Sequence, residues 1–490
     1  PKYNQSLIPE RWLIPGLGDA EARFDSTLKR DIVSGRTPAK RRTFHNGTHA
    51  MNNKMTRTNR RSFLKTATAA SAAISTFHIL PARGAESSDK VNLAIIGCSN
   101  QGGGIGNRAI RTGMANVVAL CDVTPSRTGR FKEQHPDAKI YSDFRTMFDE
   151  MGDKIDACTA GVPDHAHFPI AMRAMAEGTA VYVEKPLAHT FEECELLIAA
   201  EKKHHGVCQM GNQGHSDAQR MQFQTWVEQG IIKNVRRVDA CMNKGRRWHP
   251  WGNVTGFPAA EPMPAGMNWD VWTGTAPLHD YSQRFDNGNW RGWYDYGNGA
   301  FGDWGPHTLD SIHRFLELGL PYEIRADKLE GQNDYIYPMA TTIAFEFAER
   351  GPGMPAMSIN WYDGVDNKPP QPKELSQKGA TVPACGKVMY SDDLTFLGGT
   401  HSGKLSILSD TDLKEKLPEI PAGDTDQNHM KNFMLAAMGK EECNSKFAVS
   451  GPLTQVFMLG CIAQRLGGTL KFDTEKKVIT NNERANQLLK

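Results

Sequence analysis

The chain has 490 residues, of which 39% are hydrophobic and 23% are charged, and its formal net charge is +2. Such a composition is typical of a globular protein with two or three domains and argues against a basic face for nucleic acid. The nine cysteines are scattered, odd in number and without a C-x-x-C pair, which argues against a disulfide framework and a structural zinc site. We therefore expect reduced thiols, no metal and no nucleic-acid partner.

The first 89 residues are expected to lie outside the folded domains. Residues 1–50 are polar, basic and without periodicity, which predicts a disordered extension or one upstream of the true start. Residues 51–89 contain NRRSFLK, a weakly apolar stretch and a small-residue end, an order that resembles a twin-arginine export signal with a linker. We expect the export machinery as a partner and a periplasmic location, with a membrane tether if the leader stays uncleaved. The alternative is an ordinary alanine-rich helix.

Short apolar runs alternate with helical segments between residues 89 and 212. The expected strands are residues 91–97, 116–122, 156–161, 180–185 and 207–212. The expected helices are residues 102–113, 142–151, 165–178 and 190–205. This alternation predicts an α/β domain at residues 90–212, with a parallel sheet and helices on both faces.

The segment GCSNQGGGIG at residues 97–106 follows the first expected strand and opens the first helix. Its glycines suit a dinucleotide-binding loop, although Ser99 stands where the middle glycine of G-x-G-x-x-G is usual. Asp122 ends the second strand, where a carboxylate can accept the ribose hydroxyls of NAD or, alternatively, cap a turn. Arg127 is the nearby cation that would favour NADP instead. We predict NAD as the cofactor, bound by Gly97, Ser99, Asn100, Gln101, Gly102 and Asp122.

Two further motifs carry acid–base chemistry. In Glu184-Lys185-Pro186, at the end of a strand, Lys185 can lie beside the nicotinamide and donate to a substrate hydroxyl, although a surface turn is an alternative. Asp303 and His307 lie four residues apart in GDWGPHTLDSIH, and Gly305-Pro306 predicts that their helix begins only there. The imidazole can act as a general base on a hydroxyl, and the carboxylate can orient it. The alternative is a helix cap beside a structural histidine.

The pattern changes after residue 213. Alternating apolar residues predict mostly antiparallel strands, at residues 235–244, 343–349, 356–363, 388–393 and 394–399. Helices are expected at residues 216–229, 425–440 and 449–466. Seven of the ten tryptophans lie between residues 248 and 304. Indoles among polar groups are typical of carbohydrate clefts, and we expect most of these to be core and a few, among Trp248, Trp290 and Trp293, to contact substrate.

Taken together, these motifs resemble the glucose–fructose oxidoreductase, inositol dehydrogenase and MocA (Gfo/Idh/MocA) family, in its exported bacterial branch. The order matches: glycine loop, Asp122, GVPDHAHFP at residues 161–169, E-K-P, then D-x-x-x-H. The resemblance implies a Rossmann domain at residues 90–212. It also implies an α/β domain at residues 213–490, built on a large, open, mostly antiparallel sheet whose outer face often forms a dimer or tetramer contact.

The resemblance also implies roles for individual residues. Lys185, Asp303 and His307 match the catalytic set of the family. Pro163 and His165 match residues that line the nicotinamide, and Glu184 sits beside it. Asn212, Gln213 and His215, in MGNQGHS, lie where the chain leaves the first domain and are expected to contact cofactor or substrate.

These features predict hydride transfer between NAD and a sugar or polyol, with His307 removing the hydroxyl proton. An exported enzyme has little free NAD to exchange, so we expect a tightly held cofactor that is reset within each cycle. Redox-neutral glycoside cleavage, by oxidation, elimination and re-reduction, is the second prediction. A non-catalytic protein that binds NAD or a sugar is the third.

Overall fold

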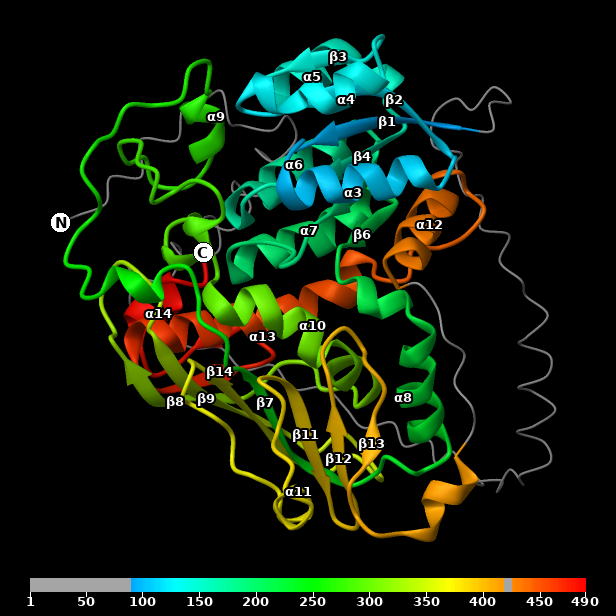
Figure 1. Ribbon diagram of the computed structural model, residues 1–490, viewed down its shortest axis with the longest axis vertical. Coiled ribbons are helices and arrows are strands. Elements are labelled where there is room, and N and C mark those ends of the chain that lie inside the picture. The colour runs from blue at the N-terminus through cyan, green and yellow to red at the C-terminus, as the bar shows by residue number, and fades with distance from the viewer. Residues whose placement is uncertain (1–89, 418–424) are drawn as a thin grey trace, which may run out of the picture. The chain divides into compact units, whose positions relative to one another are not determined.

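The computed structural model describes residues 90–417 and 425–490, so the expected extension and export signal lie outside the described part of the chain. In the described residues, helices separate a parallel sheet from a mixed sheet (Figure 1). The two sheets confirm the predicted fold class, an α/β domain followed by a second domain on a large, mostly antiparallel sheet.

The first sheet is parallel throughout, with strand order β3-β2-β1-β4-β5-β6 among the described residues. Its strands are β1 (Val91–Ile96), β2 (Ala115–Cys121), β3 (Lys139–Tyr141), β4 (Ala157–Ala160), β5 (Ala180–Val183) and β6 (Cys208–Met210). The sequence pattern missed β3, whose three residues are too few to show a period. The strand order reverses between β1 and β4, which opens a crevice at the carboxyl ends of these strands.

Five helices connect these strands: α3 (Asn100–Arg111), α4 (Gly129–Gln134), α5 (Phe144–Met151), α6 (Asp164–Ala176) and α7 (Phe191–His204), counting described residues only. The best-capped of them is α7, where Thr190 and Glu193 form a reciprocal capping box. The alternation predicted from the sequence is thus present, with boundaries shifted by a few residues.

The second sheet has the order β13-β12-β11-β7-β10-β9-β8-β14-β15 within residues 235–479 as described. Neighbouring strands are antiparallel except β7 and β10, which are parallel. The strands are β7 (Val235–Met242), β8 (Glu323–Glu330), β9 (Ala340–Phe347), β10 (Met357–Asp363), β11 (Cys385–Ser391), β12 (Thr395–Gly398), β13 (Ser406–Ile407), β14 (Gly468–Asp473) and β15 (Val478–Ile479). The sequence analysis missed β8, in which charged residues interrupt the apolar alternation.

Helices of the second half lie between and around the sheets (Figure 1). They are α8 (Ala218–Glu228), α9 (Trp269–Thr273), α10 (Gly299–Phe315), α11 (Lys373–Gln377), α12 (Thr425–Ala437), α13 (Phe447–Leu466) and α14 (Glu483–Gln487). Among the described helices, α13 alone is long and apolar enough to cross a membrane, with a mean hydropathy of 1.3. Because it packs against α7, α10 and β8, and 83% of its apolar window is buried, it is a core helix.

The core of the first domain is completed by the far end of the chain. Met430, Phe433 and Met434 of α12 pack in one apolar cluster with Leu93 and Ile95 of β1. The boundary expected at residue 212 therefore does not divide the packing, since residues beyond 425 return to cover the parallel sheet. All nine cysteines lie in described segments as free thiols, and only Cys385 is not buried.

Three glycines set the distance between α3 and the parallel sheet. Gly97 ends β1 with φ of +82°, in the left-handed region that favours glycine. Gly102 lies in the first turn of α3 and faces Gly161, which follows β4. A methyl group on either residue would overlap the backbone of the other. Only glycines at both positions let the helix N-terminus approach the strand ends this closely.

We predict that Gly161→Ala destabilises the fold by about 1–3 kcal/mol, because the added methyl group would overlap the Cα of Gly102. The free energy of unfolding in urea measures this change. Gly104→Ala is the matched control, since the nearest atom to its added methyl group is 3.7 Å away on the same helix. That variant should be as stable as the wild type or slightly more stable. Equal losses in the two variants would contradict the close approach at Gly161.

Candidate active site

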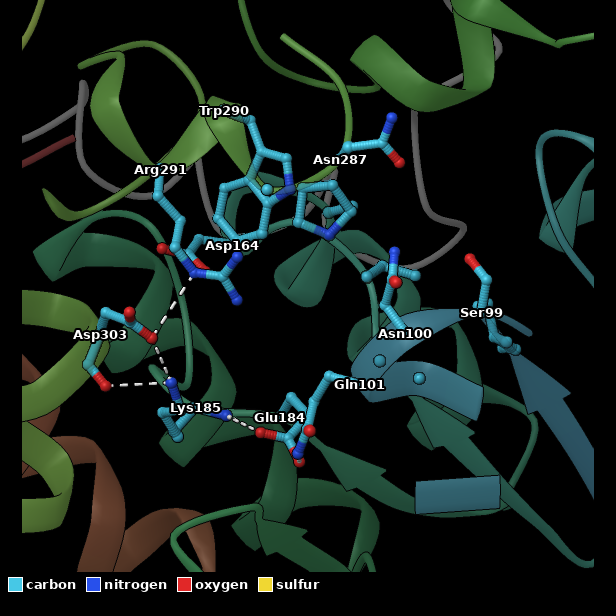
Figure 2. A pocket seen from close by; sticks show the side chains of 18 of the residues that line it. Ser99, Asn100, Gln101, Asp164, Glu184, Lys185, Asn287, Trp290, Arg291 and Asp303 are labelled. Carbon is cyan, nitrogen blue, oxygen red and sulfur yellow. Dashed lines mark hydrogen bonds and ion pairs between the residues drawn. The ribbon is translucent and has the colours of Figure 1, made fainter. Parts of the chain in front are cut away.

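A cavity of about 780 Å³ lies at the carboxyl ends of the parallel strands and is closed on its other side by residues of the second domain. It brings most of the predicted site residues together (Figure 2). Those that line it are Gly97, Ser99, Asn100, Gln101, Gly102, Asp122, Pro163, Glu184, Lys185, Gln213, Trp290, Asp303 and His307.

One end of the cavity is formed by the N-terminus of α3. Ser99 is its N-cap residue and makes no capping bond with its side chain, and the first turn holds no acidic residue. Free N–H groups and the positive end of the helix dipole favour an anionic group here. The departure from the glycine motif at Ser99 thus leaves the helix N-terminus open to a phosphate.

Asp122 lies beside this end and is buried. Its carboxylate accepts the backbone N–H of Cys98 at 2.9 Å and of Thr124 at 3.0 Å. Burial raises the pKa of Asp122, and these two hydrogen bonds oppose the rise. Arg127 pairs with Asp286 of the second domain at 2.9 Å, so the cation expected to favour a 2′-phosphate is already neutralised.

The other end of the cavity centres on Asp303, only 14% of whose side chain is exposed. Lys185 donates to Asp303 Oδ1 at 2.5 Å and to its backbone carbonyl at 2.9 Å, as Figure 2 shows. Arg246 bonds to Oδ2, and Arg291 lies 3.5 Å from Oδ1. Although burial opposes it, the charges of Lys185, Arg291 and Arg246 hold the pKa of Asp303 well below its usual range. Asp303 is therefore an ionised carboxylate shared by three cations.

His307 lies one helical turn after Asp303 and is buried. The expectation that this helix begins near Gly305-Pro306 was wrong: α10 begins at Gly299, so Asp303 and His307 share one face of it. Burial, followed by the charge of Lys185 and the neighbouring His401, lowers the pKa of His307 well below its ordinary value. The imidazole is thus neutral near pH 7 and able to accept a proton.

His401 packs directly on His307, with ring centroids 3.9 Å apart and an interplanar angle of 19°. Its backbone N–H donates to the carbonyl of His307 at 2.6 Å. The Nδ1 atom of His307 is buried and has no hydrogen-bond partner among the described residues. Stacking therefore fixes the His307 ring, and its Nδ1 atom makes no hydrogen bond to another described group of the protein.

Two more carboxylates line the cavity between its ends. Glu184 accepts the side-chain amides of Gln101 at 3.0 Å and Gln213 at 3.1 Å. Asp164 accepts the backbone N–H of Asn298 at 3.0 Å. Burial raises the pKa of Glu184 and raises that of Asp164 to about 7. Asp164 can therefore exist as a neutral acid or as a carboxylate near neutral pH.

Three predicted site residues do not line this cavity: His165, Asn212 and His215. The ring nitrogens of His165 lie 3.1 and 2.7 Å from two backbone carbonyls, and its side chain lines a separate cavity of about 290 Å³. Asn212 accepts the hydroxyl of Ser445 at 2.7 Å. His215 bonds to Asp310 at 2.9 Å and to Arg314. All three are buried and join structural elements.

Two of the three tryptophans expected to contact substrate also lie elsewhere. Trp248 and Trp293 are buried in an aromatic cluster of the segment between β7 and α10, where the indole of Trp293 donates to the carbonyl of Arg284 at 2.8 Å. Trp290 lines the cavity as predicted, and Trp272 and Trp304 line it as well. Indole-rich composition indicated a cleft correctly, but packing decided which rings face it.

Sequence reasoning missed several cavity residues, above all Arg246, Arg247, Arg291 and His401. The basic pair in KGRRW follows directly after an expected strand, a signal that could have found Arg246 and Arg247. His401 comes from a loop beyond β12 and carries no motif. Within the described ranges, no three His, Cys, Asp or Glu side chains are grouped so as to hold a metal ion.

Comparison with known proteins agrees with the fold. Residues 91–212 match the model of an oxidoreductase family with an NAD-binding Rossmann fold, and residues 217–349 match its C-terminal alpha/beta domain. An inositol 2-dehydrogenase/D-chiro-inositol 3-dehydrogenase of Lactiplantibacillus plantarum is 28% identical over 25% of this chain and 35% of its own length. A glycosyl hydrolase family 109 protein of Shewanella pealeana is 25% identical over 39% of this chain and 47% of its own length. The chain thus matches less than half the length of these curated relatives.

Two solved structures share the fold. An aldose-aldose oxidoreductase from Caulobacter crescentus has a TM-score of 0.51 and 17% identity, covering 78% of this chain and all of its own. The WlbA dehydrogenase from Bordetella pertussis, in complex with NADH and UDP-GlcNAcA, has a TM-score of 0.53 and 15% identity, covering 78% and 99%.

A Rossmann domain joined to an α/β domain, with a glycine loop and a Lys–Asp–His group facing one cavity, defines a dinucleotide-binding protein of the oxidoreductase class. More narrowly, the chain belongs to the Gfo/Idh/MocA oxidoreductase family.

We predict that Asp303→Asn destabilises the protein by about 2–4 kcal/mol, because it leaves Lys185, Arg246 and Arg291 gathered without a counter-charge. Urea unfolding at low and high salt measures the loss, which salt should reduce. Asp392→Asn breaks the exposed pair with Arg236 and serves as the control, with no expected change. If both variants unfold like the wild type, Asp303 does not hold the cluster together.

Proposed function

We propose that this protein is an NAD-dependent oxidoreductase that moves hydride to or from a carbon of a sugar or polyol. The observation that carries the proposal is the placement of Lys185, Asp303 and a neutral His307 at one end of a cavity whose other end is the glycine loop. This arrangement puts a proton acceptor and a cation beside the place where a nicotinamide would lie.

The residues present fit NAD. The glycines at 97, 102 and 161 leave the close approach that a pyrophosphate needs at the N-terminus of α3. Asp122 faces the same end, and because Arg127 is paired with Asp286, we propose NAD rather than NADP. Glu184 and Pro163 line the part toward Lys185. When bound, NAD supplies the ring carbon that accepts or returns the hydride.

The protein's own groups handle the proton and the oxygen. In the oxidising direction His307 accepts the proton of the substrate hydroxyl, because its low pKa keeps it neutral. Lys185 donates to the same oxygen and stabilises the negative charge that develops there. Asp303, 2.5 Å from the ammonium, holds Lys185 in position.

We further propose that the protein is exported by the twin-arginine route, on the strength of residues 59–84, and that it holds its cofactor through each cycle. The ion pair between Arg127 and Asp286 supports retention of the cofactor, since it joins the two domains across the cavity. We also propose that the protein forms a homo-oligomer, as the family resemblance implies.

Redox-neutral glycoside cleavage is a second candidate, favoured by two observations. The match to a glycosyl hydrolase family 109 protein spans 215 residues. Such a reaction also needs a second proton-transfer group for the C–H beside the oxidised carbon, and His401 lies on the cavity wall stacked on His307. His401 would remove that proton as the alkoxide leaves and takes a proton from water. The resulting hydroxide adds at the vacated carbon, and His401 returns its proton to the neighbouring carbon.

The first experiment is to purify the exported protein, denature it and quantify the released nucleotide. We expect about one NAD(H) per chain, and a change in the near-ultraviolet absorbance of the intact protein when sugars and polyols are added. Release of the alcohol from an added glycoside, with no lasting change in that absorbance, would favour the second candidate. A protein that holds no nucleotide and gains none from added NAD or NADP would contradict the proposal.

We predict that His307→Asn lowers kcat by about 10²–10⁴-fold without releasing the cofactor, because it removes only the proton acceptor. His313→Asn on the same helix is the control, since His313 lies outside the cavity and bonds to the carbonyl of Gly319 at 3.0 Å. In the wild type the activity should persist below pH 6.5 and fall only as pH drops through the depressed pKa of His307. A pH profile with a midpoint at or above 6.5 would argue against His307 as the base.

A further inference from the structure

Four cationic side chains gather at the end of the cavity that would hold the substrate. Lys185 comes from the strand end after β5, Arg246 and Arg247 follow β7, and Arg291 precedes α10. They reach the same place from segments that are far apart in the sequence, so their convergence is a property of the folded site.

Among the described residues, one carboxylate forms ion pairs with these cations. Asp303 is the ionised carboxylate that Lys185, Arg246 and Arg291 share. The nearby carboxyl of Asp164 has a pKa raised to about 7 by burial, so it neutralises the group only in part. The four cations thus share one ion-paired carboxylate, while Asp164 and Glu184 act on them from farther away.

Arg247 is the one of these four cations that forms no ion pair with Asp303. No hydrogen bond or ion pair within the described ranges involves its guanidinium, and the side chain is exposed to the cavity. It lies against Gly288, where an added methyl group would overlap the Arg247 guanidinium and come within 3.0 Å of Nη1 of Arg291. Partial burial and the charges of Arg291 and Arg246 lower the pKa of Arg247. The guanidinium groups of Arg247 and Arg291 thus lie side by side at Gly288.

Arg291 lies away from the N-terminus of α3, where the phosphates of the cofactor would bind. Figure 2 shows Arg291 beside Asp303 and Asp164, whereas Ser99 and Asn100, at the N-terminus of α3, lie at the opposite side of the cavity. Guanidinium groups form paired hydrogen bonds with carboxylate and phosphate oxygens, which suits them to an anion on the substrate.

We infer that the substrate is an acidic carbohydrate, one whose sugar or polyol carries a carboxylate or a phosphate, and that Arg247 and Arg291 bind this group. The inference rests on the proposed function for the position of the reacting carbon. It narrows the substrate class from sugars in general to those with a negative charge within reach of these two arginines.

The test compares neutral sugars with their charged counterparts on the cofactor-loaded protein. Glucose is compared with glucuronate and glucose 6-phosphate, and galactose with galacturonate and galactose 6-phosphate, by titration calorimetry and by the near-ultraviolet absorbance of the cofactor. We expect a charged member to bind at least tenfold more tightly than its neutral partner in at least one series. Preference for the uronate or for the phosphate identifies the anion.

Arg247→Gln should reduce the preference for the charged over the neutral member about tenfold, as the loss of one charge-assisted contact implies. Arg284→Gln is the matched control: Arg284 lies in the same connecting segment, over the ring of Trp251 and outside the cavity, and its loss should leave the preference unchanged. Equal effects of the two variants would show only a general charge effect and overturn the inference.

The readouts separate this inference from the proposed function. Binding of an acidic sugar without any reduction of the cofactor would support the anion site and contradict the proposed oxidoreductase activity. Reduction of the cofactor by neutral sugars, with no preference for charged ones, would support the oxidoreductase activity and overturn the anion site. Absence of both binding and reduction across the panel would overturn both.

Discussion

The site depends on one carboxylate, that of Asp303. Lys185 comes from the Rossmann domain and Arg246 and Arg291 come from the second domain, and all three cations meet at its two oxygens. Their charges keep Asp303 ionised in spite of burial, and Asp303 in turn holds Lys185 in place. The same Lys185 helps to keep His307 neutral. The ion cluster therefore ties the two domains together and prepares a cation and a proton acceptor side by side.

Backbone geometry explains why these groups can meet a dinucleotide. The reversal of strand order between β1 and β4 opens the crevice, and the close contact of Gly102 with Gly161 draws the N-terminus of α3 to its edge. The segment between β7 and α10 then covers the crevice and supplies both Asp286, which holds Arg127, and Arg291. The Rossmann domain thus provides the cofactor end, and the second domain decides what chemistry faces it.

The arginines also show how a shared fold can serve different substrates. Two solved structures with the same fold have 17% and 15% sequence identity to this chain, so the likeness shows the architecture alone. The lining is set by residues on loops that follow β7 and precede α10, which can change without disturbing either sheet. The arginines of the proposed anion site therefore lie outside the strands of both sheets.

The sequence alone determined the parts of the protein that depend on local order. Strand–helix alternation, the glycine loop, Asp122 at a strand end and the spacing of Asp303 and His307 all follow from neighbours along the chain, and they predicted the fold class and the residues of both cavity ends. Tertiary structure decided which polar and aromatic side chains face the cavity. His165 and Trp293 are buried away from this cavity, whereas Arg247 and His401 reach the site from distant loops. The physical reason is that packing decides where a side chain points and which distant segments touch, and packing leaves no periodic signal in the sequence.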